Sequence, residues 1–255
     1  MTDKMTRLWA TKTKDDEWWS SFVTAPLGIA GNLWAVDISA ITPNRITAAS
    51  FVVAIIASLC ILVGGFGWFF AAAILIHVSH ILDCMDGQMA RFRKVSSPIG
   101  SYYDRLTDQV QVTLWFGAAS YAAYAQSLSV VPVFLALIGI AFYALRGYVK
   151  YIALEIETAI DPGYPARMAA MKRDEAAAGL GFGFAANIRW LFREQRKILA
   201  FDEGVFIFML SAALIFDQLT PMLWIFAASQ VFWGTYRAWQ RGTNIDAHHK
   251  QLFHK

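Results

Sequence analysis

Six apolar stretches alternate with polar or charged connections along this chain, and all but one of these connections are short. The stretches cover residues 47–66, 68–90, 102–125, 129–150, 204–218 and 220–238. About 20 consecutive apolar residues in a helix cross the hydrocarbon core of a bilayer. The pattern therefore predicts an all-α integral membrane protein with six transmembrane helices, which form one domain at 47–240.

The residues before the first apolar stretch have a different character. Residues 16–36 are rich in aromatic and apolar side chains but too short to span, and Pro26 and Gly28 are expected to break them. Tryptophan side chains in such a segment favour the depth of the lipid headgroups. We expect an interfacial amphipathic segment within a cytoplasmic N-terminal region at 1–46. Pro43, preceded by Thr42, is expected to open the first span.

Two further polar regions complete the predicted organisation. A cytoplasmic insertion at about 155–203 separates the fourth and fifth spans. Within it, 166–178 is typical of a short charged helix, and 187–201 is typical of a basic amphipathic segment at an anionic membrane surface. The last residues, 241–255, are expected to form a cytoplasmic tail.

The distribution of basic residues predicts the orientation. The connections at 64–67, 126–131 and 217–221 contain no Lys or Arg, so all 22 basic residues fall on the opposite side. Basic residues near span ends stay in the cytoplasm. A multi-pass protein with both termini cytoplasmic is therefore expected. A composition that is 57% hydrophobic and 16% charged excludes an ordinary soluble domain, and the net charge of +3 gives no reason to expect nucleic acid as a partner.

Four aspartates lie where the second and third spans meet the cytoplasm, at positions 83, 86, 104 and 108. One Asp inside a membrane helix costs about 2.5–3.5 kcal/mol on insertion scales. Two carboxylates near 4 Å repel by about 4 kcal/mol even at an effective dielectric constant of 20. Bound Mg²⁺ or Mn²⁺ would offset this cost, because both are hard cations that prefer carboxylate oxygens.

Helical periodicity places these residues on two facing surfaces. At 100° per residue, one face of the second span carries Asp83, Asp86, Gly87, Ala90 and Arg91. One face of the third span carries Gly100, Asp104, Thr107, Asp108 and Gln111. The short link at 92–99 predicts antiparallel neighbours whose acidic faces meet, with Arg91 suited to a phosphate oxygen and Asp108 to accepting a proton.

Two other uses of polar residues in these spans were weighed. His77 and His80 precede the acidic motif by one to two turns. We expect them to form hydrogen bonds between helices rather than to bind metal. A divalent-cation carrier is a remote alternative for the aspartates, because a carrier would place carboxylates near the middle of several spans. Here the outer halves of the spans are almost free of ionisable groups.

The complete string D-x-x-D-G-x-x-A-R-x8-G-x3-D-x3-D at 83–108 resembles the signature of the CDP-alcohol phosphotransferase family. The resemblance implies six spans, a two-metal centre and a homodimer. It also implies that Asp83, Asp86, Asp104 and Asp108 bind the metals, with Asp108 as the catalytic base. Contacts to the CDP group are implied for Gly87, Ala90 and Arg91, and a weaker match adds Asn44 and Thr47.

The implied reaction is attack of an alcohol on the β-phosphorus of a CDP-alcohol, with release of CMP. We expect a CDP-linked lipid such as CDP-diacylglycerol as the donor and a small, polar alcohol as the acceptor. Arg146 and Lys150, with Arg193, Arg196 and Lys197, would suit a phosphorylated acceptor. A CDP-linked polar alcohol as donor with a lipid alcohol as acceptor is the alternative that the motif leaves open.

Overall fold

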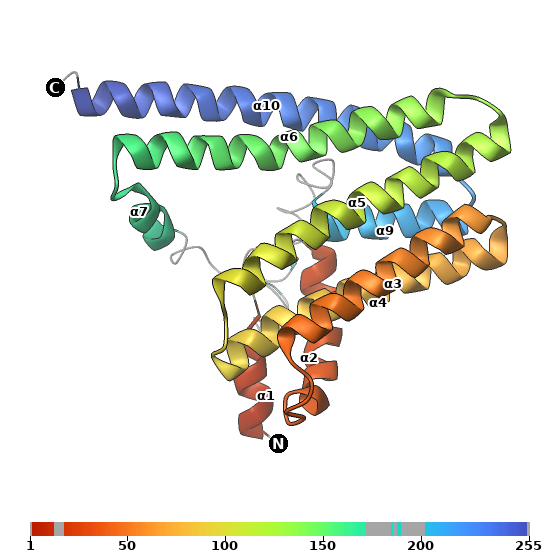
Figure 1. The fold of residues 1–255 in the computed structure, drawn as a ribbon, viewed down its shortest axis with the longest axis horizontal. Helices are drawn as coiled ribbons and strands as arrows, with labels where there is room; N and C mark the ends of the chain where they lie inside the picture. Colours follow the sequence, from red (N-terminus) through yellow and green to blue (C-terminus); the bar gives the residue numbers. More distant parts are fainter. Residues whose placement is uncertain (1, 13–17, 172–184, 186–187, 190–201, 254–255) are drawn as a thin grey trace.

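The computed structural model describes residues 2–12, 18–171, 185, 188–189 and 202–253. Every regular element among them is a helix. The bundle in Figure 1 is formed by α3 (Pro43–Val63), α4 (Phe66–Arg93), α5 (Pro98–Ser127), α6 (Val131–Ile160), α9 (Glu203–Ile215) and α10 (Leu219–Phe253). These helices coincide with the six predicted apolar stretches, so the prediction of an all-helical protein is confirmed.

The helices differ in their capacity to cross a membrane. Among the described helices, α3, α4 and α6 are long and apolar enough to do so by length and composition, and α9 is a shorter apolar helix. Membrane-capable helices are therefore confirmed in this bundle. Six crossings remain a prediction.

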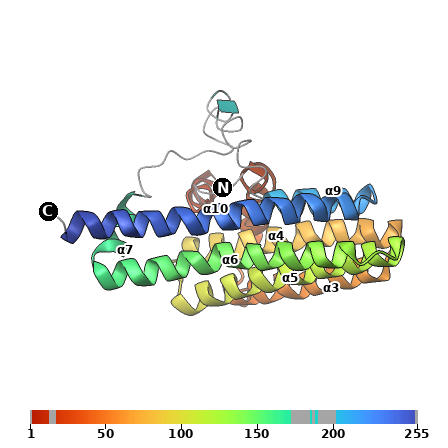
Figure 2. The same cartoon turned by 90° about the horizontal axis from the view of Figure 1, so that it is seen from above.

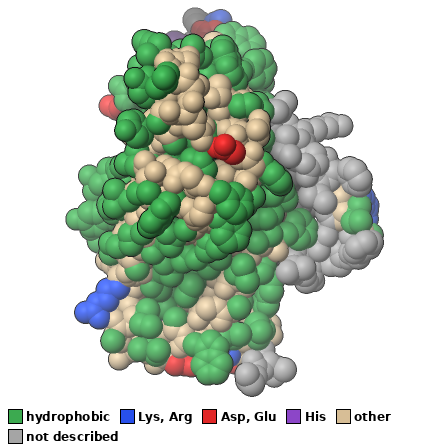
Figure 3. Space-filling model, turned by 90° about the vertical axis from the view of Figure 1, so that its right-hand side faces the viewer, with side chains coloured by type: hydrophobic (Ala, Val, Ile, Leu, Met, Phe, Trp, Pro, Cys, Tyr) green, Lys and Arg blue, Asp and Glu red, His purple; other side chains and the backbone are tan. Residues whose placement is uncertain are grey.

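Consecutive bundle helices run in opposite directions, and three of their turns lie at one end of the bundle (Figure 1). The α3–α4 turn contains Gly64 and Gly65, whose φ angles of 79° and 85° favour residues without a Cβ atom. The α5–α6 and α9–α10 turns use Leu128 and Asp217, each with φ 55°. No Lys or Arg lies in these turns, and the view onto this end in Figure 3 is dominated by hydrophobic side chains.

The starts of two helices follow capping chemistry that is visible in the sequence. The Thr42 side chain accepts a hydrogen bond from the Arg45 backbone N–H at 3.3 Å, and Pro43 follows as the first residue of α3. At α5, Ser97 accepts from the Gly100 backbone N–H at 3.1 Å. Each cap satisfies a backbone donor that has no partner within its helix. α3 therefore begins at Pro43, where the sequence predicts.

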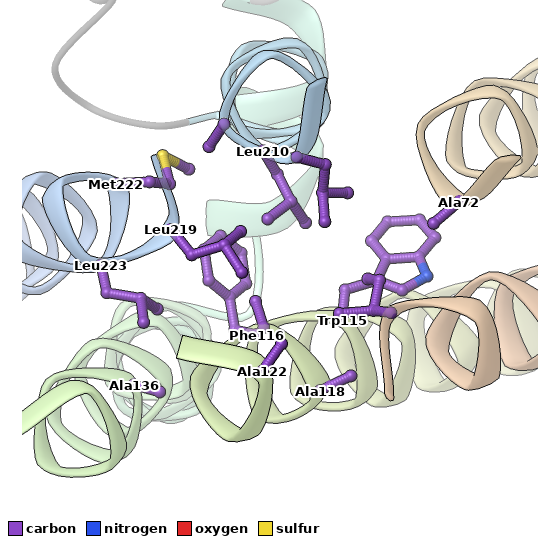
Figure 4. Packing of buried hydrophobic residues seen from close by; sticks show 14 of the residues in the cluster. Ala72, Trp115, Phe116, Ala118, Ala122, Ala136, Leu210, Leu219, Met222 and Leu223 are labelled. Atoms are coloured by element: carbon purple, nitrogen blue, oxygen red, sulfur yellow. The ribbon is translucent and has the colours of Figure 1, made fainter. Parts of the chain in front are cut away.

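The core of the bundle lies among α3, α4, α5, α6, α9 and α10 (Figure 4). Trp115 and Phe116 of α5 are fully buried in it. Phe116 stacks on Phe226 of α10 with ring centroids 3.7 Å apart. Gly139 of α6 allows α10 to approach, because a Cβ atom there would lie 2.4 Å from the Phe226 ring. Aromatic packing thus fixes α5 against α10.

Three N-terminal elements pack beside the bundle: α1 (Thr2–Trp9), the π-helix η1 (Ser20–Thr24) and α2 (Ala25–Ala35). The predicted break at Pro26 is wrong, because the backbone stays helical from η1 into α2, with Thr24 and Ala25 both in the right-handed helical region. η1 is a π-type turn directly before Pro26, and such turns depart from regular α-helical hydrogen bonding. Gly28 does not break the helix either. It allows close packing, since a Cβ atom there would lie 3.1 Å from Oε1 of Gln88 on α4.

The polar regions depart from the predicted boundaries. α6 continues to Ile160, and α7 (Tyr164–Met171) follows it. The predicted helix at 166–178 thus begins earlier, and its remainder lies outside the described residues, as does most of the predicted basic amphipathic segment at 187–201. α10 continues as one helix through Phe253 and lies along α6 (Figure 2), so most of the predicted tail at 241–255 is helical.

Candidate active site

Three carboxylates from two helices meet inside the bundle. Asp83 of α4 and Asp104 and Asp108 of α5 each place one oxygen within 4.8 Å of the others. We call these three residues the carboxylate group. Oδ1 of Asp83 and Oδ1 of Asp108 are buried and have no hydrogen-bond partner among the described residues.

The chemistry of the carboxylate group fits a divalent cation. Two unit negative charges about 4 Å apart repel by about 4 kcal/mol at an effective dielectric constant of 20. Buried carboxylate oxygens that lack hydrogen-bond donors lose the solvation of water without replacing it. A hard cation such as Mg²⁺ binds such oxygens and completes its shell with water or substrate phosphate.

The helices that carry the carboxylate group do not pack directly on each other along their length. α3 packs against both α4 and α5, whereas contact between α4 and α5 is sparse in the described structure. The two helices run in opposite directions (Figure 1), as predicted, but the prediction that they are packed neighbours is wrong, because α3 lies against both. Their acidic faces meet through side chains, which leaves cavities on both sides of the carboxylate group.

Asp86 lies one turn from Asp83 but is oriented differently. It is buried, and its Oδ2 accepts a short hydrogen bond from the Thr47 hydroxyl of α3. Asp86 is not among the carboxylates whose oxygens lie within 4.8 Å of one another. The structure thus brings three of the four predicted metal ligands together and places Asp86 beside them, in a cavity that Asp104 also lines.

The cavity on the Asp86 side has a volume of about 500 Å³. Residues from α3, α4 and the start of α5 line it. They include all five residues that the resemblance assigns to the nucleotide: Asn44, Thr47, Gly87, Ala90 and Arg91. Ser96, Ser97 and Ser101 add hydroxyl groups that sequence reasoning missed, although the Ser-Ser-Pro run at 96–98 pointed to a polar turn.

Arg91 is oriented by the N-terminal segment and by Gly87. Its Nε donates a hydrogen bond to the Thr11 carbonyl at 2.6 Å. A Cβ atom on Gly87 would lie 3.1 Å from Nη1 of Arg91, so Gly87 lets the guanidinium lie close to the α4 backbone. The role of Thr11 leaves no recognisable signal in the sequence, because it uses only a backbone carbonyl.

Arg93 anchors the polypeptide that borders the same cavity. Its guanidinium donates to the carbonyls of Val36, Ile41, Ala35 and Ile38, at distances from 2.5 to 3.2 Å. These carbonyls belong to the end of α2 and to the loop before α3. Arg93 therefore fixes the loop that leads to Asn44 and Thr47.

A second cavity, of about 930 Å³, lies on the Asp108 side of α5. Arg146 and Lys150, the predicted acceptor contacts, both line it, as do Asp202 and Glu203 at the start of α9. Arg105, Arg237 and Arg241 also line it, and sequence reasoning missed all three. In the sequence, these three residues are indistinguishable from the basic residues expected on the cytoplasmic side. Arg193, Arg196 and Lys197 lie outside the described residues.

Arg146 is held in place by two acceptors from different helices. One Nη atom lies 2.8 Å from Oδ1 of Asp202, and the other donates to Oε1 of Gln230 at 2.9 Å. These contacts join α6 to the start of α9 and to α10. The guanidinium is thereby fixed at the wall of the 930 Å³ cavity.

Comparison with known proteins gives two results. The model of the family described as CDP-alcohol phosphatidyltransferase matches residues 40–226, a range that contains the carboxylate group. A bifunctional IPC transferase and DIPP synthase of Thermococcus kodakarensis is 32% identical over 99 residues, which are 39% of this chain and 22% of that protein. The match thus spans about a fifth of the length of that relative.

Proposed function

The chain belongs to the CDP-alcohol phosphatidyltransferase family, and we propose that it moves a phosphatidyl-type group from a CDP-linked lipid to a polar alcohol. CMP is the second product, and the reaction serves phospholipid synthesis. One observation carries the proposal beyond the family: the carboxylate group joins two cavities. Asp104 lines the 500 Å³ cavity, and Asp108 lines the 930 Å³ cavity.

Each cavity suits one substrate. The 500 Å³ cavity would hold the cytidine diphosphate of the donor against Asn44, Thr47, Gly87, Ala90 and Arg91. Arg91 supplies guanidinium donors for phosphate oxygens, while the Thr47 hydroxyl donates to Asp86. The 930 Å³ cavity would hold the acceptor, and its basic side chains favour a phosphorylated alcohol. The carboxylate group would then lie where the donor phosphates meet the acceptor hydroxyl.

Asp83, Asp86, Asp104 and Asp108 would hold two Mg²⁺ or Mn²⁺ ions. Such ions neutralise the charge that develops on the pyrophosphate as the leaving group departs. The unpartnered Oδ1 atoms of Asp83 and Asp108 support this assignment. Thr47 holds Asp86 in place through its hydroxyl, as the groups surrounding metal ligands commonly do.

The proposed chemistry is a direct displacement. The acceptor hydroxyl oxygen forms a bond to the β-phosphorus of the donor. The bond between that phosphorus and the oxygen bridging to the α-phosphate breaks, and CMP leaves with that oxygen. The hydroxyl proton passes to Asp108, which faces the acceptor cavity and is the proposed general base.

We further propose an integral, multi-pass protein whose active site and termini face the cytoplasm. The absence of Lys and Arg from the three turns at the opposite end of the bundle supports this orientation. The exposed apolar side chains of α3, such as Val52 and Leu59 at 54% and 56% exposure, would contact membrane lipids. Assembly as a homodimer is an expectation from the family.

Release of CMP tests the reaction. Purified protein in detergent, supplied with Mg²⁺ and CDP-diacylglycerol, should release CMP when one alcohol from a panel of free and phosphorylated polar alcohols is added. Lys150→Gln should raise the KM of a phosphorylated acceptor and leave the KM of the donor unchanged, because Lys150 lines only the acceptor cavity. Lys94→Gln, outside both cavities, is the matched control.

Two results would contradict parts of this proposal. If CMP appeared only from a CDP-linked polar alcohol with diacylglycerol, the polarity of donor and acceptor would be reversed. If proteoliposomes moved divalent cations without nucleotide and no substrate pair released CMP, the protein would be a cation carrier.

A further inference from the structure

His80 lies one turn before Asp83 on α4 and is almost completely buried, with its side chain 5% exposed. Its Nδ1 atom has no hydrogen-bond partner among the described residues. Among the described residues, the nearest carboxylate oxygen to Nδ1 is Oε1 of Glu203, at 3.8 Å. That distance is beyond a hydrogen bond, so the buried ring nitrogen is directed towards a carboxylate without bonding to it.

The other ring nitrogen has a partner that fixes the ring. Nε2 lies 2.8 Å from the Ser20 hydroxyl of η1. With its proton on Nε2, the imidazole donates to Ser20 and directs the Nδ1 lone pair towards Glu203. A metal-binding histidine is commonly held in this way, with its second nitrogen bonded to a neighbouring group.

Three side chains converge at this point. His80, Asp83 and Glu203 each place one candidate ligand atom within 4.8 Å of the others. Glu203 comes from the first turn of α9, while His80 and Asp83 share one face of α4. The sequence hid this arrangement, because more than 100 residues separate Glu203 from the α4 pair.

We infer that His80, Asp83 and Glu203 form a second cation site, with one nitrogen and two carboxylate ligands. An imidazole ligand shifts preference from Mg²⁺ towards Mn²⁺, Zn²⁺ and Co²⁺. The site is thus distinct in chemistry from the carboxylate group, which offers oxygen atoms alone. The expectation that His80 serves only for hydrogen bonding between helices is thereby extended: Nε2 meets that expectation, and Nδ1 is a ligand.

Asp83 belongs to both sites, which couples them. A transition-metal ion bound by His80 and Glu203 would also bind an oxygen of Asp83, whose carboxyl is part of the carboxylate group. Glu203 also lines the 930 Å³ cavity, so an ion at this site is reachable from the cavity. The inference concerns metal binding and does not depend on the proposed reaction.

Pulsed electron paramagnetic resonance of bound Mn²⁺ tests the site directly, because an imidazole ligand produces a ¹⁴N coupling that oxygen ligands do not. Tag-free protein without substrates is loaded with Mn²⁺ alone. The wild type should show the coupling, and His80→Gln should lose it. His77→Gln is the matched control, since His77 lies one turn earlier on α4 and its Nδ1 lies 2.8 Å from the Ala73 carbonyl.

Two further variants give quantitative support. Glu203→Gln should weaken Mn²⁺ binding at the nitrogen-containing site, whereas Glu155→Gln, an exposed glutamate of α6, should not. Ser20→Ala should weaken it by about 10- to 100-fold through loss of the group that orients His80. Circular dichroism and size-exclusion chromatography establish whether each variant is folded. If His80→Gln does not fold, Glu203→Gln tests the same site.

The inference is overturned by any of three results. These are absence of a ¹⁴N coupling in the wild type, its persistence in His80→Gln, and its equal loss in His77→Gln. Mn²⁺ bound through oxygen ligands alone would leave the carboxylate group as the metal site and exclude His80 from it.

Discussion

Two clusters of carboxylates in this bundle differ in the side chains that surround them. In the carboxylate group, Asp83, Asp104 and Asp108 face one another. At the far ends of α6 and α10, Asp161 instead pairs with Arg167, and Glu157 with His248. We call these last four residues the paired cluster. The first cluster brings carboxylates together, whereas the second places each carboxylate against a nitrogen of Arg167 or His248.

The surroundings of each cluster match this difference. In the paired cluster, Oδ1 of Asp161 also accepts from the Gly163 backbone N–H at 2.9 Å. The hydrogen bond from Arg167 is the main cause that lowers the pKa of the Asp161 carboxyl. In the carboxylate group, oxygens of Asp83 and Asp108 remain unpartnered within the described structure. Paired carboxylates stabilise a fold, and unpartnered buried ones indicate a ligand.

The largest difference between the clusters is expected in catalysis. Asp108→Asn keeps the size of the side chain but removes the group that accepts the proton, so CMP release should fall by about 100- to 10,000-fold. The same substitution in the paired cluster, Asp161→Asn, should leave the rate near that of the wild type. Steady-state release of CMP with saturating substrates measures both.

Metal binding separates the possible causes of a loss at Asp108. Asp83, Asp86 and Asp104 remain in the Asp108→Asn variant, so Mg²⁺ should still bind. Near-normal turnover by Asp108→Asn would exclude it as the base. An equal loss in Asp161→Asn would show that the comparison between the clusters is wrong.

A smaller effect, a fall in Tm in the paired cluster alone, is expected in stability. Asp104→Asn removes one of three repelling charges, so the Tm without divalent cations should rise or stay unchanged. Asp161→Asn removes the partner of Arg167, so its Tm should fall. Thermal unfolding in detergent measures both.

Added Mg²⁺ sharpens the same measurement. A ligand at 100 times its Kd stabilises the folded state by about 2.7 kcal/mol. Mg²⁺ should therefore raise the Tm of the wild type and of Asp161→Asn. It should raise the Tm of Asp104→Asn by less. A Tm of Asp104→Asn that falls without Mg²⁺ would mean that the carboxylate group is paired in the fold after all.

The two clusters also differ in how far the sequence predicts them. The motif at 83–108 identified the carboxylate group because its members lie close in sequence and follow helical periodicity. Asn44 and Thr47, which line the 500 Å³ cavity, were identified through the family resemblance alone. Helix positions were predictable for a related reason, because long apolar stretches are local features.

Pairing between distant segments was not predictable. Glu157 and His248 are far apart in sequence. Their contact shows that α10 continues beside α6 past the end of its apolar stretch. Lys250, 2.6 Å from Asp246 one turn earlier, further supports this extension. Arg237 and Arg241 line the 930 Å³ cavity for the same reason: α10 returns along α6. The hydrogen bond between Thr47 and Asp86 was not predictable either, because the two residues lie on different helices.

The smallest expected effect is a pH dependence confined to the paired cluster. A carboxyl whose pKa is lowered on folding stabilises the fold above its unfolded pKa, which is about 3.9 for Asp, and loses that contribution as the pH falls through the folded value. Arg167→Gln should therefore lower the Tm slightly at neutral pH. The difference from the wild type should shrink below about pH 4.

The difference between the two proteins isolates the pair, because the carboxylate group titrates in both and its contribution cancels. The effect should be small, since the Arg167 side chain is 50% exposed and Asp161 19%, so that water and salt screen the pair. Added salt should reduce the difference at neutral pH for the same reason. A difference that stayed constant through acid pH would show that Arg167 acts through packing on α7, and the paired cluster would then be held by Glu157 and His248 alone.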